Sequence, residues 1–150
     1  MEVYTIGHTQ TPAAEFFGKL KRAGIRRLVD VRLSNVSQLA GFAKRDDLEF
    51  FLSEICGIEY LHEPRLAPTK EILDAFKNSR GKNSRISWEE YEKRFMQLMT
   101  EREIATVLDP ALLQGASVLL CSELTADHCH RRLVLEYLDR TWGDIRAVHL

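Results

Sequence analysis

The sequence has no excess of charge of either sign and no long apolar run. Its 21 Lys and Arg residues nearly balance 22 Asp and Glu residues, which leaves a formal net charge of −1. The overall field therefore draws the protein neither to nucleic acid nor to a membrane, although local patches remain open. No apolar segment approaches the roughly 18 residues that a membrane span needs. The start, Met1–Tyr4, lacks the basic and apolar regions of a signal peptide. We expect a cytoplasmic protein that does not contact the membrane.

Several signatures of known sites are also missing. The number of cysteines, three, is odd, which argues against a disulfide framework. They include no Cys-x-x-Cys pair, so the sequence indicates neither a zinc ribbon nor a paired redox motif. The sequence contains no glycine-rich phosphate loop and no dinucleotide fingerprint. A phosphatase-type loop would need arginine at the position that Asp127 occupies, counted from Cys121. We therefore expect no cofactor and no tightly bound metal.

The composition and the hydrophobic pattern predict one α/β domain over residues 1–150. Hydrophobic residues make up 45% of the 150, enough for an ordinary core. Short apolar runs alternate with segments of helical periodicity, which is typical of a parallel sheet covered on both faces. We expect a single three-layer domain with a mostly parallel sheet of about five strands flanked by helices. The expected strands are 3–6, 28–31, 58–61, 117–120 and 145–148.

Polar groups follow four of these expected strands. The carboxyl ends of parallel strands meet at one edge of the sheet, where ligands bind in open α/β sheets. We therefore expect these groups to lie close together: Gly7 and His8, Asp30 and Arg32, His62, and Cys121 with Glu123.

The long helix expected from about residue 126 adds three more groups to this edge. His130 falls on the buried stripe that continues through Leu133 and Val134. It lies in the first turn, and helical side chains tilt toward the amino terminus, so it should point at Cys121. Cys129 lies near the helix start, where the dipole favours a thiolate, and Arg131 adds positive charge.

These residues favour nucleophilic chemistry on an anionic substrate. Cys121 or Cys129 would be the nucleophile and His130 the base. Asp30 or Glu123 would orient the base, and Arg32 and Arg131 would hold the anion. Purely structural roles for the same residues also remain open. The cysteines and the histidine could be packed in the core, Asp30 and Arg32 could form a structural ion pair, and Glu123 could cap the helix. Four residues could bind zinc if they converge, although their spacing matches no standard site: His62, Cys121, Cys129 and His130.

The order of several motifs resembles that of DUF488, a family of proteins with a domain of unknown function. The resemblance rests on these blocks: Thr5-Ile6-Gly7-His8-Thr9, Asp30-Val31-Arg32, Ser37, Phe42, Tyr60 to Leu66, Cys121-Ser122-Glu123 and Cys129-His130-Arg131. The family tends to have Pro, Arg and Gly where this chain has Asn35, Gln38 and Ala67, so the loop after the second expected strand could differ in shape and charge. The resemblance supports the fold and the cluster of site residues, and it implies no reaction.

Three functions follow as hypotheses. The first is an enzyme that acts on a small anionic substrate, bearing a phosphate or a nucleotide. The second is a non-catalytic module that binds nucleic acid through a basic segment without acidic residues, which contains Lys77, Arg80, Lys82 and Arg85. The third is a metal-binding structural domain.

Overall fold

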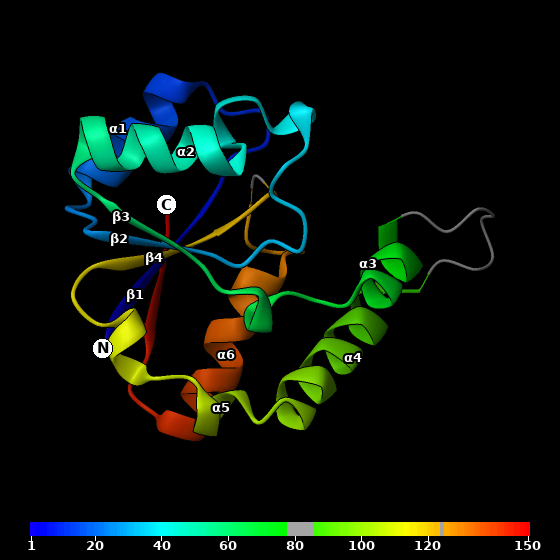
Figure 1. Ribbon diagram of the computed structural model, residues 1–150. Helices are drawn as coiled ribbons and strands as arrows, with labels where there is room; N and C mark the ends of the chain where they lie inside the picture. The colour runs from blue at the N-terminus through cyan, green and yellow to red at the C-terminus, as the bar shows by residue number, and fades with distance from the viewer. Residues whose placement is uncertain (78–85, 124) are drawn as a thin grey trace.

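All five strands of the computed structural model, which describes residues 1–77, 86–123 and 125–150, run parallel in one sheet. Their order is β3-β2-β4-β1-β5, so β1 and β2 are separated by β4 (Figure 1). The sequence prediction of an α/β fold with about five parallel strands is confirmed. The strands are β1 (Glu2–Gly7), β2 (Arg27–Asp30), β3 (Glu59–His62), β4 (Ser117–Cys121) and β5 (Arg146–His149).

Helices cover both faces of the sheet, which gives the three expected layers (Figure 1). One face carries α1 (Ala13–Arg22) and α2 (Arg45–Phe51), and a π-helical turn over Leu52–Cys56 continues α2. The other face carries α4 (Trp88–Glu101), α5 (Ile104–Val107) and α6 (His130–Trp142). Helix α3 (Lys70–Lys77) has no buried residue and packs on α4. Short 3-10 segments over Gln38–Ala43, Pro64–Leu66 and Pro110–Leu113 complete the described structure.

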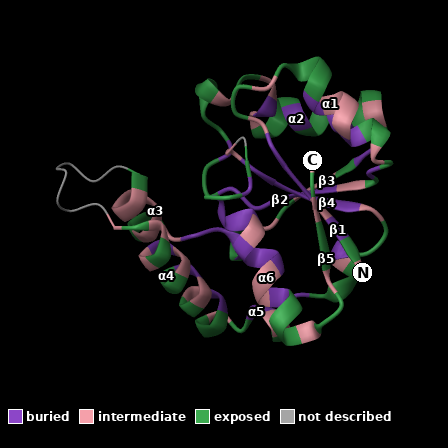
Figure 2. Cartoon of the chain, turned by 180° about the vertical axis from the view of Figure 1, so that it is seen from behind, coloured by how far each residue is buried: buried purple, intermediate pink, exposed green. Residues whose placement is uncertain are grey.

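Alternate residues of the central strands β2 and β4 point to opposite faces of the sheet, where they belong to two separate hydrophobic cores. Leu28 and Leu120 pack with α1 and α2, whereas Val29 and Leu119 pack with α4 and α6. This is the two-residue period of a strand that is buried on both sides. Cys121 has the same parity as Leu119 and therefore belongs to the α4/α6 core. Figure 2 shows the buried positions running through the sheet and along the inner side of α6.

The start of α6 differs from the sequence prediction. The expected long helix from about residue 126 begins at His130, because a turn closed by the Cys129 N–H and the Ala126 carbonyl (3.3 Å) precedes it. Cys129 is the extended residue before the helix, with φ −133° and ψ 139°. Helix α1 starts after Pro12 without a side-chain cap, and the Thr11 hydroxyl donates to the Thr9 carbonyl. No helix among the described segments is both long and apolar enough to cross a membrane.

Candidate functional site

A pocket opens at the carboxyl edge of the sheet, between the ends of β2 and β4. The chain leaves β2 toward α2 on one face and leaves β4 toward α6 on the other, and such a divergence opens a crevice in a parallel sheet. The cavity has a volume of about 150 Å³. We call it the strand-end pocket; its polar lining includes Arg32, Lys77, Cys121, Glu123, Cys129 and His130, and its apolar wall includes Leu73, Phe76 and Tyr91.

Cys121 and His130 form a hydrogen-bonded pair inside the pocket. The Cys121 Sγ lies 3.4 Å from His130 Nδ1, and His130 Nε2 lies 2.7 Å from the Val31 carbonyl oxygen. A carbonyl only accepts, so Nε2 carries the hydrogen and donates it. In the neutral ring Nδ1 is then the acceptor, placed to take the thiol proton of Cys121. Both side chains are about 95% buried, since each is 5% exposed.

The surroundings of the two pocket cysteines shift their pKa values in opposite directions. Burial raises the pKa of Cys121, but a hydrogen bond from Cys129, the charge of Arg131 and backbone N–H groups outweigh it, so the pKa lies below its ordinary 9.0. Burial also raises the pKa of Cys129, and its hydrogen bond with Cys121 raises it further, well above 9.0. Of the two expected nucleophiles, Cys121 therefore has the greater thiolate character.

The same cluster contains the ligand atoms for a cation. The side-chain ligand atoms of Cys121, Cys129 and His130 lie within 4.8 Å of one another. Two thiolates and an imidazole are a ligand set that suits zinc. His62, the fourth expected ligand, lies elsewhere: it is exposed and its Nε2 lies 3.2 Å from the carbonyl oxygen of Arg32.

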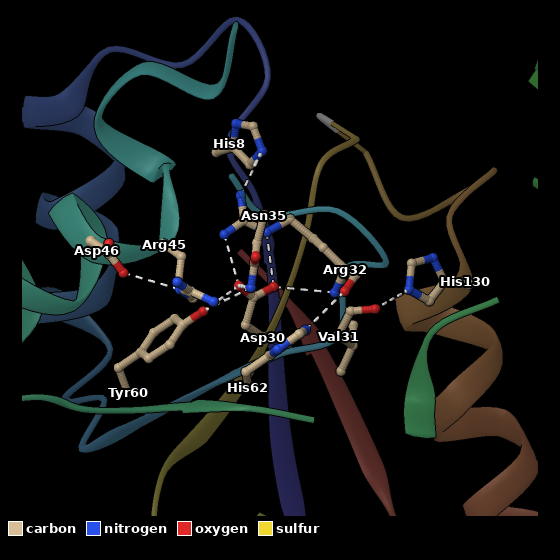
Figure 3. A network of polar contacts seen from close by, with 10 residues as sticks. All are labelled: His8, Asp30, Val31, Arg32, Asn35, Arg45, Asp46, Tyr60, His62 and His130. Atoms are coloured by element: carbon tan, nitrogen blue, oxygen red, sulfur yellow. Dashed lines mark hydrogen bonds and ion pairs between the residues drawn. The ribbon is translucent and has the colours of Figure 1, made fainter. Parts of the chain in front are cut away.

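Asp30 is part of a different network, on the other face of the sheet. It shares the parity of Leu28 and so points toward the α1/α2 side, away from the α4/α6 side that holds Cys121 and His130. For this reason Asp30 does not orient His130, and the Val31 carbonyl does so instead, as Figure 3 shows. The expected role of Asp30 beside the base is wrong on geometric grounds.

Arg32 holds Asp30 through two parallel hydrogen bonds. The Arg32 Nε and Nη2 atoms lie 2.8 and 2.7 Å from the two carboxylate oxygens, and Asp30 is fully buried. Tyr60 donates its hydroxyl to Asp30 at 2.6 Å, and Asn35 donates at 3.3 Å (Figure 3). Burial raises the pKa of Asp30, but these donors outweigh it and the pKa lies below 3.8. The structural ion pair between Asp30 and Arg32, which the sequence left open, is therefore formed. The remaining side-chain nitrogen of Arg32, Nη1, does not contact Asp30 and lies 3.4 Å from His8 Nε2.

Arg131 and Gly7 shape the loop that follows Cys121. Arg131 is 1% exposed and donates from Nη1 to the Glu123 carbonyl at 2.6 Å. Gly7 pairs with Cys121 in the sheet, and a Cβ added at Gly7 would lie 1.5 Å from that same carbonyl oxygen. Both guanidinium groups expected to hold an anion therefore make contacts within the protein, Arg131 with the Glu123 carbonyl and Arg32 with Asp30.

The other expected residues lie at the rim or outside the pocket. Glu123 forms an ion pair with Lys77 at the pocket mouth rather than capping α6 or orienting His130. His8 lies over a shallow depression with Phe42. Burial and the charge of Arg32 lower the pKa of His8 to about 4. Arg80, Lys82 and Arg85 of the expected basic segment lie outside the described residues.

Sequence reasoning missed three kinds of contributor. Tyr60 and Asn35 hold Asp30, and no pattern in the sequence signals that contact. The Val31 carbonyl orients the base, and a backbone group has no sequence signature. Tyr91 was not among the expected site residues, yet it lines the pocket while 2% exposed. Its place on the inward stripe of α4, opposite the end of β4, could have indicated this.

Comparison with known proteins identifies the family. The family described as a domain of unknown function, DUF488, matches residues 12–138, which is most of the chain. The chain therefore belongs to the DUF488 family, as the sequence motifs predicted. Neither the curated proteins nor the solved structures contain a match.

Proposed function

We propose that this member of the DUF488 family is an enzyme in which Cys121 attacks a small anionic substrate. His130 takes the thiol proton through Nδ1 and returns it to the leaving group. The Val31 carbonyl fixes the imidazole in the tautomer that this exchange requires. Arg131 supplies a buried positive charge near the thiolate without touching the substrate.

The observation that carries the proposal is the position of His130 between two partners. Its Nδ1 lies 3.4 Å from the Cys121 sulfur and its Nε2 lies 2.7 Å from the Val31 carbonyl oxygen. A nucleophile, a base and a group that orients the base are the three parts of an activated thiol. Because both the cysteine and the histidine line an open cavity, a substrate has access to the sulfur.

Lys77 replaces the two arginines as the proposed anion contact. Arg32 is committed to buried Asp30, whereas Lys77 is paired with Glu123 at the pocket mouth, where the two side chains are 36% and 39% exposed. Exposed ion pairs contribute only about 0–1 kcal/mol, so a substrate carboxylate or phosphate can displace Glu123. The cavity of about 150 Å³ admits the reacting part of a substrate, and the rest of a nucleotide would lie outside it.

Two alkylating reagents of similar size and different charge test this proposal. Iodoacetamide is neutral and iodoacetate is anionic, and mass spectrometry reports the labelling of each cysteine separately. We expect Cys121 to react with iodoacetamide faster than Cys56, and to favour iodoacetate by about fivefold relative to Cys56, the effect of ~1 kcal/mol. Lys77→Gln should remove that preference, whereas Lys70→Gln on the same helix should preserve it.

The base is tested with the same reagents. His130→Gln should slow Cys121 labelling at pH 7 by about tenfold or more and leave Cys56 unchanged. His62→Gln is the matched control, since His62 is exposed and contacts only a backbone carbonyl in the described network. Slow, equal labelling of all three cysteines would remove the nucleophile. Binding of a labelled oligonucleotide by such an unreactive protein would favour the nucleic-acid module instead.

A further inference from the structure

We infer that Cys121 and Cys129 form a redox-active dithiol that exchanges with small disulfides bearing an acidic group. Cys121 makes the first attack and Cys129 resolves the intermediate. The inference rests on the proposed function, because it takes Cys121 as the reactive thiol and names the class of substrate that this thiol attacks.

The two sulfurs lie near each other in one cavity. Both cysteines line the strand-end pocket. Their sulfurs lie within 4.8 Å, in one cluster with the imidazole nitrogen of His130. Cys121 is the last residue of β4, and Cys129 is the extended residue directly before α6. The third cysteine, Cys56, packs against the opposite core.

The two thiols differ in the way that a nucleophile and a resolving thiol differ. The Cys121 sulfur lies 3.4 Å from His130 Nδ1, whereas Cys129 directly precedes α6 and lines the same pocket. His130 is therefore placed to deprotonate Cys121 for the first attack, and Cys129 acts once the intermediate has formed. Once His130 has given its proton to the first leaving thiolate, its Nδ1 is free to act as a base again. The proton of Cys129 can then pass to His130.

The reaction balances without any further reagent. The Cys121 sulfur attacks one sulfur of the disulfide R–S–S–R, a Cys121–S–S–R bond forms, and one R–S⁻ leaves with the proton from His130. Cys129 then passes its proton to His130 and attacks the Cys121 sulfur. The second R–S⁻ leaves with that proton. The sum is two R–SH and one Cys121–Cys129 disulfide, with two electrons passed from the protein to the substrate.

The pocket favours a small, acidic disulfide over a protein disulfide. Cys121 is 5% exposed and is reached through a cavity of about 150 Å³, so a disulfide fixed in a folded partner cannot align with its sulfur. Phe76 and Tyr91 form an apolar wall beside the sulfurs, and Lys77 stands at the mouth. The proposed substrate half therefore has a short apolar body and a carboxylate.

The aromatic disulfide 5,5′-dithiobis(2-nitrobenzoic acid) is a suitable probe, because each half carries a carboxylate and releases a coloured thiolate. In a Cys56→Ser background we expect two thiolates released per chain, with no adduct retained and a mass lower by two hydrogens. Cys129→Ser in that background should release one thiolate and retain one adduct on Cys121. Dithiothreitol should restore the starting mass in both cases.

The outcomes separate this inference from the proposed function. If Cys121 reacts neither with the probe nor with iodoacetamide, the proposed function and the dithiol inference both fail. If Cys121 reacts but keeps its adduct while Cys129 is present, the dithiol inference is overturned and the nucleophile survives. One zinc ion per chain in protein purified without added metal, with neither thiol reactive until a chelator is added, would also overturn it and assign the cluster to a metal. Cys129→Ala provides a second variant if Cys129→Ser is poorly folded by circular dichroism.

Discussion

Replacing Gly7 with alanine tests how closely the end of β1 packs against the loop after Cys121. The added Cβ would lie 1.5 Å from the Glu123 carbonyl oxygen and 2.9 Å from Arg131 Nη1. A carbonyl oxygen must then retreat by roughly 2 Å to reach ordinary contact. That movement breaks the charged hydrogen bond from Arg131 (2.6 Å) and the backbone bond from Thr9 to Ser122 (2.9 Å). Losing these costs about 1.5–3 and 0.5–1.5 kcal/mol.

We therefore expect Gly7→Ala to lower the free energy of unfolding by about 2–4.5 kcal/mol. Urea unfolding followed by circular dichroism measures this, and the iodoacetamide rate at Cys121 should change with it because Arg131 is displaced. Gly18→Ala is the matched control: its Cβ meets the end of the flexible Arg22 side chain at 3.0 Å within α1. The Gly18→Ala variant should leave the free energy of unfolding unchanged or raise it by about 0.5–1 kcal/mol. A Gly7→Ala protein as stable as the wild type would refute the close packing of this loop.

The remaining predictions concern the Asp30 network and His8. Asp30→Asn leaves Arg32 buried without its partner and should destabilise by about 3–5 kcal/mol in the same urea assay, whereas the exposed control Asp46→Asn should change little. Because the folded pKa of Asp30 is lowered, its stabilisation is present above pH 3.8 and is lost as pH falls through the folded value. The variant should therefore show a shallower loss of stability below about pH 5, and an unchanged slope would contradict the pairing. Tyr60→Phe removes a 2.6 Å donor to that carboxylate and should cost about 1–3 kcal/mol; no change would mean that water or Asn35 replaces it. The His8 ring should stay neutral down to a pKa of about 4, and a proton resonance that titrates near 6.5 would disprove its burial beside Arg32.

The fold was predictable because its signals are local and repeated. Apolar runs alternate with helical periodicity along the whole chain, and Ser87 with Glu90 marks the start of α4, where the Ser87 hydroxyl accepts from the Glu90 N–H at 3.1 Å. The start of α6 was less predictable. Its apolar stripe extends back to His130, but Arg131 in its first turn donates to the Glu123 carbonyl, which packs against Gly7 of β1, more than a hundred residues away in the sequence.

The membership of the site was easier to predict than the contacts within it. Position in the sequence indicates which groups reach the strand ends, and so Cys121, Cys129 and His130 were expected there. It does not indicate the partner of each group. Asp30 and Cys121 follow neighbouring strands, yet they point to opposite faces because their positions in the register differ by one residue. A resemblance to a family identifies the types of residue at the site, but it does not say to which face of the sheet each side chain points.

The strand order also bears on when the site forms during synthesis. β1 lies between β4 and β5, and each of these pairings joins residues more than a hundred positions apart. Long-range pairings of this kind slow folding, because a large loop must close before any contact rewards it. A nascent chain that has released β1, β2 and α1 from the ribosome lacks the strand that joins them, since β4 separates β1 from β2. The apolar edges of those strands remain open to other chains until residue 121 emerges. Cys121 ends β4, the strand that joins β1 to β2, and Cys129 follows it closely, so the pocket cysteines are synthesised together with the segment that completes the sheet's centre.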